Sequence, residues 1–353
     1  MSSATSNVIT GLDVSDRYSS YYTITAEGEV VEEGRVRTTR TALEAYFAGP
    51  RRRVVLEAGP HSPWINRLLK ELGHEVIVAN ARMVALIHSN PKKRDPIDAQ
   101  ILARLGRADP KLLYPIQHRS EEVQVDLGVV RARDVVVRAR TGLINHVRGS
   151  VKSFGARIPR CFAEGFAAKA EEYVPEALRA GLEPVVEMIR ALSRQIRFFD
   201  RQVEVLCAER YPETGVLRQI KGVGPVTALT FCLVIEDPAR FPSSRAVGAY
   251  LGLTRRHDDS GEFEPELRIT KAGDEFLRRL LVQSAHYILG HFGPDTDLRR
   301  WGLRYIERGG GSKTAKKKAA VAVARKVAVL LHRLWSTGEV YQPLRENQHA
   351  AAA

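Results

Sequence analysis

Four acidic side chains in the N-terminal third of the sequence could do metal-assisted phosphate chemistry. Asp13 and Glu57 each end a short apolar run, and Asp95 and Asp98 open an amphipathic stretch. The i,i+3 spacing places the last two on one face of a helix. Carboxylate oxygens are the ligands that Mg²⁺ takes, and enzymes that cut phosphodiesters with two metal ions need several of them together. The pattern therefore predicts a Mg²⁺ site formed by these four residues.

Each acid also has an ordinary structural interpretation. Asp13 could be a turn residue after its strand, and Glu57 could be a solvated strand end. The segment 95–98 reads Asp-Pro-Ile-Asp, which suits a helix start without any metal, because its acids and proline fit the first helical positions. As a set, however, an acid ending the first strand, an acid ending the fourth and a pair on a helix have the layout of an RNase H-like fold.

A polar loop in the C-terminal half contains a candidate nucleophile. Ser260 follows Arg255 and Arg256 in the run Arg-Arg-His-Asp-Asp-Ser-Gly. A serine beside cations could attack a phosphodiester while the cations stabilise the developing charge. Taken alone, the same run is also an ordinary turn.

A Gly-Val-Gly-Pro segment is a second candidate for phosphate contact. Gly222 and Gly224 stand between two helical patterns, where a turn could present backbone N–H groups to a phosphate, as in helix-hairpin-helix DNA binders. A tight turn between helices would need the same glycines without any ligand, so both interpretations stay open.

Basic residues exceed acidic ones and gather towards the C-terminus. The 353 residues contain 54 Lys and Arg against 41 Asp and Glu, a formal net charge of +13. Residues 301–353 alone hold 10 basic and 3 acidic side chains. This excess predicts a polyanionic partner, usually nucleic acid, although lysines can also simply solvate a helical face. The predicted nucleic-acid contacts are Arg255, Arg256, Lys313, Lys316, Lys317, Lys318, Arg325 and Lys326, together with the two glycines.

Composition and motifs exclude several functional classes. No apolar run approaches the roughly 18 residues of a membrane span, and the first residues lack the pattern of a signal peptide. Cys161, Cys207 and Cys232 are too scattered for a disulfide framework or a zinc site. The run Gly-Gly-Gly-Ser-Lys-Thr at 309–314 lacks the P-loop spacing and a preceding strand. We expect a cytoplasmic protein with no membrane partner and no nucleotide site.

The elements that would position these residues fall into three regions. Strands first in hairpins and then alternating with helices predict a mixed α/β sheet. Two long helical patterns predict an arm, either a hairpin within the chain or a coiled-coil dimer, and shorter helices follow from 214 onward. The strand patterns lie at 7–13, 18–26, 29–37, 53–57 and 74–78, and the helical ones at 41–47, 64–72, 95–107, 120–151 and 175–209.

Six segments, in this order and spacing, resemble the insertion-sequence 110 family of transposases, whose architecture the pilin-gene invertases share. The resemblance covers residues 8–335. The segments are Gly-Leu-Asp-Val-Ser at 11–15, Leu-Glu-Ala-Gly at 56–59, Lys-Arg-Asp-Pro-Ile-Asp-Ala at 93–99, Gly-Val-Gly-Pro-Val-Thr-Ala at 222–228, Tyr-Leu-Gly-Leu-Thr at 250–254 and Ser-Gly at 260–261.

The resemblance implies an α/β fold joined to an α region. Its parts would be an N-terminal RNase H-like (RuvC-like) mixed sheet over 1–115, a helical coiled-coil arm over 116–210, a mainly helical C-terminal transposase domain over 211–340, and a flexible tail over 341–353.

Matched motif by motif, the family's DEDD tetrad falls on the four acids named above, and its nucleophilic serine falls on Ser260. Two departures surround that serine, because Arg255 replaces the more usual Pro and Glu262 stands where Gly is common. Ser243 and Ser244 are therefore the alternative nucleophiles.

The implied activity is DNA recombination with Mg²⁺ as cofactor. Ser260 would attack the scissile phosphate, leaving a covalent phosphoserine and a free 3′-hydroxyl. Family members resemble one another in using a structured non-coding bridge RNA that pairs with donor and target DNA. The resemblance also implies a homo-oligomer, a dimer or tetramer, in which the serine of one subunit completes the acidic site of another.

Two other classes compete with this interpretation. In a RuvC-like nuclease the four acids would activate water, and Ser260 would only shape a turn. A non-catalytic nucleic-acid-binding protein is disfavoured, because four converging acids would repel the ligand that the net charge of +13 attracts, unless a metal intervenes.

Overall fold

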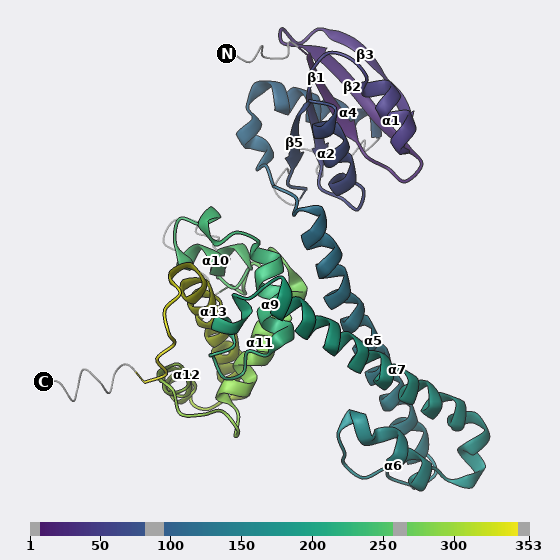
Figure 1. Cartoon of the computed structure of the whole chain (residues 1–353), viewed down its shortest axis with the longest axis vertical. Helices are drawn as coiled ribbons and strands as arrows, with labels where there is room; N and C mark the ends of the chain where they lie inside the picture. Colours follow the sequence, from purple (N-terminus) through teal and green to yellow (C-terminus); the bar gives the residue numbers. More distant parts are fainter. Residues whose placement is uncertain (1–7, 82–94, 257–266, 345–353) are drawn as a thin grey trace, which may run out of the picture. The chain divides into compact units, whose positions relative to one another are not determined.

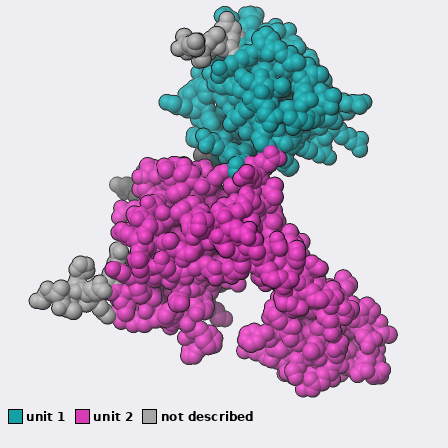
Figure 2. All heavy atoms as spheres, viewed as in Figure 1, with its two compact units in different colours: residues 1–120 teal, residues 121–353 magenta. Residues whose placement is uncertain are grey.

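The computed structural model of the chain contains two compact units, Met1–Ser120 and Glu121–Ala353, which Figure 2 colours separately. The structure describes residues 8–81, 95–256 and 267–344. The first unit is a mixed sheet with helices on both faces, and the second is helical. The predicted fold class, a mixed α/β part followed by a mainly helical part, is confirmed.

One five-stranded sheet organises the first unit, with its strands in the order β3-β2-β1-β4-β5 (Figure 1). Strand β1 runs antiparallel to β2 and parallel to β4, which in turn is parallel to β5. Parallel neighbours bring the carboxyl ends of β1 and β4 to the same edge of the sheet. The strands are β1 (Val8–Asp13), β2 (Tyr18–Thr25), β3 (Val30–Arg37), β4 (Arg53–Glu57) and β5 (Glu75–Ala79).

Each face of the sheet has its own core because successive strand residues point to opposite sides. Ile9, Tyr22 and Val55 pack against α4 (Asp95–Ala108). Leu12 and Leu56 belong to the other core, beneath helices α1 (Arg40–Phe47) and α2 (Ser62–Glu71). This unit also contains the 3₁₀ turn η1 (Pro110–Leu113).

Helix α4 lies unusually close to the sheet at two glycines. A Cβ atom on Gly11 would come 2.0 Å from the carbonyl oxygen of Ala99, which is backbone of α4. On the helix itself, a Cβ on Gly106 would come 2.4 Å from Cγ2 of Val55. Both contacts are closer than real Cβ atoms allow, so only glycine lets this helix sit directly on β1 and β4.

An antiparallel helical hairpin begins the second unit. It consists of α5 (Glu121–Lys152) and α7 (Glu176–Glu209), with the short η2 (Ala163–Gly165) and α6 (Phe166–Tyr173) at its tip (Figure 1). Arg133 Nε lies 2.6 Å from Asp200, and Arg140 donates to Ser193 Oγ at 3.2 Å. Of the two arm geometries left open by the sequence, the structure has the hairpin within one chain.

A helical domain surrounds the base of this hairpin. Its central helix α9 is buried on all sides from Thr227 to Ile235. The same core contains Val123 of α5, Val203 of α7 and Val327 of α13. The helices are α8 (Thr214–Leu217), α9 (Pro225–Ile235), η3 (Pro238–Arg240), α10 (Ser244–Tyr250), α11 (Glu275–Leu289), α12 (Asp297–Arg308) and α13 (Lys313–Thr337).

Side-chain caps explain where the last helices begin. Ser312 Oγ accepts from the Ala315 N–H to cap α13, and Asp274 caps α11 through the Leu277 N–H. At its other end α13 stops at Gly338, whose φ of 67° suits glycine. None of the helices in the described residues is both long and apolar enough to cross a membrane.

Candidate functional site

The register of the sheet places two of the predicted acids side by side. Leu12 of β1 pairs with Leu56 of β4, so the next residues, Asp13 and Glu57, lie next to each other where the strands end. Adjacent strands are roughly 4.8 Å apart, so the two carboxylates share one small region. Asp13 lies two residues after Gly11, and Glu57 two residues after Val55. Since every second residue of a strand points to the same face, both acidic side chains are on the face covered by α4.

Helix α4 adds the third predicted acid to this face. Asp98 lies in its first turn and is only 4% exposed. The next residue, Ala99, is the one whose carbonyl faces Gly11, two residues before Asp13. The structure thus brings Asp13, Glu57 and Asp98 to the same end of the same face.

The fourth acid, Asp95, begins α4 one turn before Asp98, and its side chain lies outside the described part. Among the described residues, no group of three or more His, Cys, Asp and Glu is close enough to hold a metal ion. The predicted donors on this face are carboxylate oxygens alone, a set that would suit a hard cation such as Mg²⁺ better than zinc. Two carboxylates on adjacent strand ends repel each other, and a cation relieves that repulsion.

A basic groove of about 1260 Å³ lies in the C-terminal domain, between α12, α13, α10 with the segment that follows it, and residues 339–343 after α13. Two of its three aromatic residues, Trp301 and Tyr305, lie beside one another, and Lys326 Nζ is 4.3 Å from the centre of the Trp301 ring. Only Asp297 and Glu339 contribute acids to the lining. The basic residues that line it are Arg245, Arg255, Arg268, Lys271, Lys317, Lys318, Arg325, Lys326 and Arg333.

The groove contains five of the eight predicted basic contacts and four that the sequence did not single out. Arg256, Lys313 and Lys316 are exposed but are not part of the lining. Of the four additional cations, Arg333 lies on α13 itself, whereas Arg245, Arg268 and Lys271 come from earlier segments that only the tertiary fold brings to this helix. A groove with this charge suits a phosphate backbone.

The predicted nucleophile Ser260 belongs to the segment 257–266, which lies outside the described residues. Both ends of that segment are described. Arg255 forms a β-bridge with Ile269, and the Arg256 N–H donates to the Arg268 carbonyl at 3.0 Å. Arg255, Arg268 and Ile269 line the basic groove, so the residues on both sides of this segment are part of the groove wall.

The alternative nucleophiles have different surroundings. Ser244 Oγ lies 2.9 Å from Nδ1 of His332, whose Nε2 lies 2.9 Å from the Pro238 carbonyl. With its Nε2–H donated to that carbonyl, His332 accepts a hydrogen bond from the Ser244 hydroxyl at Nδ1, so a base is within reach of this serine. The imidazole is only 3% exposed and also ties α10 to α13. Ser243 is exposed and precedes α10 without a side-chain cap.

The Gly-Val-Gly turn has a structural requirement of its own. Gly222 has a φ of +99°, and a Cβ there would come 2.8 Å from the Tyr287 ring of α11. Gly224 is exposed and directly precedes Pro225, the first residue of α9. Packing alone therefore accounts for Gly222, and Gly224 is the member of the pair that is open to a ligand.

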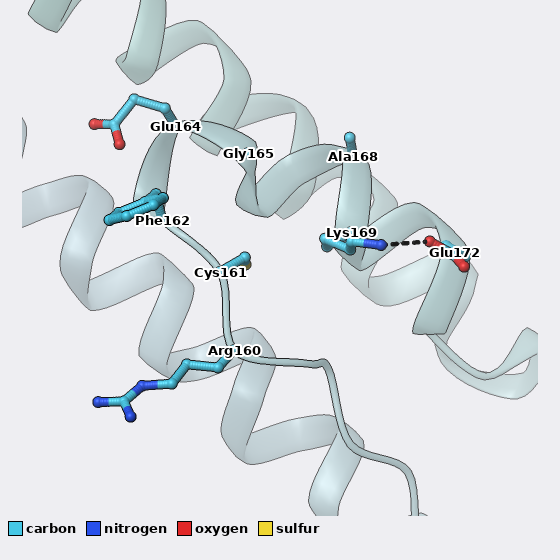
Figure 3. A pocket seen from close by; sticks show the side chains of 8 residues that line it. All are labelled: Arg160, Cys161, Phe162, Glu164, Gly165, Ala168, Lys169 and Glu172. Atoms are coloured by element: carbon cyan, nitrogen blue, oxygen red, sulfur yellow. Dashed lines mark hydrogen bonds and ion pairs between the residues drawn. The ribbon is translucent and has the colours of Figure 1, made fainter.

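The three cysteines do not form a reactive site. Burial raises the pKa of the Cys207 and Cys232 thiols, which disfavours the thiolate form that reacts. Cys161 lines a second hollow, of about 800 Å³, at the tip of the arm (Figure 3). Phe162, 87% exposed, and the ion pair of Lys169 with Glu172 at 3.2 Å lie beside it. None of the predicted site residues belongs to this hollow.

Comparison with known proteins identifies the family. Residues 10–155 match a DEDD family described as Transposase, and residues 215–299 match the Transposase IS116/IS110/IS902 family. Protein y4pF/y4sB of Sinorhizobium fredii is 30% identical over 301 residues, covering 82% of this chain and 74% of the relative. The transposase for insertion sequence element IS1328 of Yersinia enterocolitica is 30% identical over 256 residues, 71% of this chain and 75% of the relative. The transposase for IS1111A of Coxiella burnetii is 29% identical over 302 residues, 82% and 79% respectively. The chain belongs to the IS116/IS110/IS902 family of transposases.

The two matched regions contain different predicted site residues of this transposase. The DEDD match contains the sheet, α4 and the first arm helix, and so includes Asp13, Glu57 and Asp98. The second match spans α8 to the start of α12 and includes the Gly-Val-Gly turn and the segment with Ser260. Helix α13, which forms one wall of the basic groove, lies beyond both matches.

Proposed function

We propose that this transposase cleaves and rejoins DNA through attack of Ser260 on a phosphodiester, assisted by Mg²⁺ at Asp13, Glu57, Asp95 and Asp98. The observation that carries the proposal is the position of Asp13, Glu57 and Asp98 at one end of the α4 face. An all-oxygen donor set on a rigid sheet edge is suited to a hard divalent cation. Membership of a DEDD transposase family supports divalent-metal use.

Mg²⁺ bound at these acids would polarise the non-bridging oxygens of the scissile phosphate and neutralise charge as it develops there. The protein's own contribution is positional. Asp13 and Glu57 are fixed by strand pairing, and Asp98 is fixed by the packing of α4 against Gly11. Groups held on strands and helices keep the precise geometry that phosphoryl transfer needs.

The bond changes balance without an external energy source. The Ser260 oxygen forms a bond to phosphorus, its proton leaves to solvent or a nearby base, and the bond from phosphorus to the 3′-oxygen breaks. The products are a phosphoserine linked to the 5′ side and a free 3′-hydroxyl. A 3′-hydroxyl of the exchanged strand then attacks this ester, and the serine leaves with a proton. Energy conserved in the ester makes a nucleotide cofactor unnecessary.

The partners that we propose are donor and target DNA and a structured guide RNA. The net charge of +13 and the basic groove support a ligand that presents phosphates along a chain. Proteins recognise folded RNA largely through shape and backbone, which this type of lining can contact. We also propose a homo-oligomer, a dimer or tetramer, in which Ser260 of one subunit completes the acidic site of another.

The metal half of the proposal is tested by neutralising single acids in the full-length protein. Asp13→Asn, Glu57→Gln and Asp98→Asn should each lower Mg²⁺-dependent strand cleavage at least about 100-fold, because metal assistance contributes several kcal/mol to such reactions. Asp109→Asn is the matched control. Asp109 caps η1 beyond the other end of α4 by accepting from the Lys111 N–H, and asparagine can accept the same bond.

Cleavage should be measured on labelled donor and target DNA, with and without EDTA. The proposal predicts that EDTA abolishes cleavage and that Asp109→Asn stays within about twofold of wild type. Cleavage that survives EDTA, or that survives in Asp98→Asn, would contradict the metal site.

A further inference from the structure

Ser20, on strand β2 next to the central strand β1, has a hydroxyl group that the described structure leaves without a hydrogen bond. The residue is 1% exposed, and its Oγ has no hydrogen-bond partner among the described residues. Within the described ranges it is the only buried hydroxyl oxygen in this condition. Buried polar groups are nearly always paired, so an exception needs a reason.

The nearby buried hydroxyls show that the sheet can satisfy such groups. Ser19, which precedes Ser20 and points to the opposite face, lies 2.9 Å from Thr38 Oγ1. Thr23 on β2 lies 3.0 Å from Thr10 on β1, oxygen to oxygen. The unpaired state is thus specific to Ser20.

The register gives Ser20 a particular neighbour. It lies directly opposite Asp13 in the antiparallel pair of β1 and β2. Residues opposite each other in such a pair point to the same face, with Cβ atoms roughly 4.5–5.5 Å apart. Tyr22 and Ile24, which share the parity of Ser20, belong to the core beneath α4. Ser20, Asp13 and Glu57 therefore form one row across β2, β1 and β4 on the face that carries Asp98.

We propose that Ser20 is a positioning residue of the metal site, an inference that rests on the proposed function. With a cation held by the acids, the Ser20 hydroxyl would donate a hydrogen bond to the Asp13 carboxylate and so fix its orientation. Side chains that orient a metal ligand in this way commonly change metal affinity by about 10- to 100-fold when removed. In the absence of metal the hydroxyl is a buried group without a partner, which destabilises the fold.

The test compares Ser20→Ala with Ser19→Ala in the full-length protein. Binding of Mn²⁺ alone is followed by the loss of the free-ion EPR signal, and thermal melting is recorded with and without Mg²⁺. Ser20→Ala should weaken Mn²⁺ binding at least about 10-fold while leaving the metal-free melting temperature unchanged or higher. Ser19→Ala should do the reverse, because it removes a paired hydroxyl on the other face. Its metal-free melting temperature should fall, and its Mn²⁺ affinity should stay within about twofold of wild type.

The outcomes separate this inference from the proposed function. If wild type binds no Mn²⁺ and Mg²⁺ does not raise its melting temperature, the acidic metal site itself is wrong, and the role of Ser20 with it. If wild type binds Mn²⁺ and Ser20→Ala binds it equally well, the metal site stands and the role of Ser20 is wrong. A variant that loses metal affinity only in proportion to a lower metal-free melting temperature also contradicts a positioning role, since loss of folding would then explain both.

Discussion

In the N-terminal unit, the face of the sheet to which a side chain points determines which other side chains it can contact. The sequence was sufficient to predict Asp13 and Glu57 as strand ends, because each follows a short apolar run that can be recognised locally. It could not reveal that Ser20 faces the same side, since that depends on which strand pairs with β1 and in which register. For the same reason, the 4% exposure of Asp98 follows from how α4 docks and not from its local pattern.

His74 makes a prediction at this scale. The Arg52 N–H donates to its Nδ1 at 3.2 Å and its Nε2 lies 2.9 Å from the Phe47 carbonyl, which defines a neutral ring. Burial lowers the pKa of His74 below its usual 6.5. A depressed pKa in the folded state means that protons favour the unfolded chain. The stability from this residue is therefore complete above pH 6.5 and is lost as pH falls through the lower, folded pKa.

Urea unfolding at neutral and mildly acidic pH checks this expectation. Wild type should lose more stability on acidification than His74→Gln, which cannot titrate. Burial lowers the pKa of His118 as well, so some acid sensitivity should persist in the variant. An equal loss in both proteins would contradict the neutral, buried state of His74.

At the scale of elements, close packing of α4 on the sheet decides whether the acids meet. The helix pattern at 95–107 predicted the element itself, which spans Asp95–Ala108. The glycines that let it approach β1 and β4 could not be interpreted from the sequence, because a glycine in a strand or helix pattern has several explanations. Similarly, the arm was predicted as two helices, but the choice between a hairpin and a dimer needed the contacts of α5 with α7.

Gly11→Ala tests this packing. The added methyl group would meet the Ala99 carbonyl at 2.0 Å, so α4 must move away from β1. We expect a loss of about 1–3 kcal/mol in the free energy of unfolding and a larger fractional loss of cleavage, since Asp98 moves with the helix. Gly128→Ala in α5 is the control, because its Cβ would meet nothing within 4 Å and alanine favours a helix by about 1 kcal/mol over glycine. Equal denaturation midpoints for Gly11→Ala and wild type would show that α4 does not lie this close.

At the scale of the whole molecule, the two units differ in the charge of the side chains that their predicted sites contain. The first unit gathers carboxylates at one sheet edge, and the second carries a groove lined by nine basic side chains and two acids. The sequence predicted the basic α13 because its lysines are contiguous. It missed Arg245, Arg268 and Lys271 because they lie more than 40 residues before α13, and no local pattern links them to that helix. Arg333 lies on α13 but outside the run of lysines at its start.

The groove makes a prediction about salt. Replacing Lys317 and Lys318 by Gln should reduce the slope of log affinity against log salt by about 1.8 for duplex DNA, as each phosphate contact contributes about 0.9. The double variant Lys70→Gln/Lys111→Gln removes the same charge from exposed positions of the first unit, and its slope should match wild type. Fluorescence anisotropy at several salt concentrations measures both. Equal slopes in the two double variants would mean that the groove does not bind the backbone.

The central claim, that Ser260 is the nucleophile in a metal-dependent reaction at the acids, is tested most directly by a denaturing gel. Wild type, Ser260→Ala and Ser244→Ala are each incubated with Mg²⁺, donor and target DNA and the RNA transcribed from the flanking element, and the gel reports DNA attached to protein. The account predicts an adduct in wild type and in Ser244→Ala that disappears in Ser260→Ala. An adduct lost only in Ser244→Ala would move the nucleophile to the serine beside His332. Cleavage by wild type without any adduct would contradict covalent catalysis and favour a nuclease in which the acids activate water.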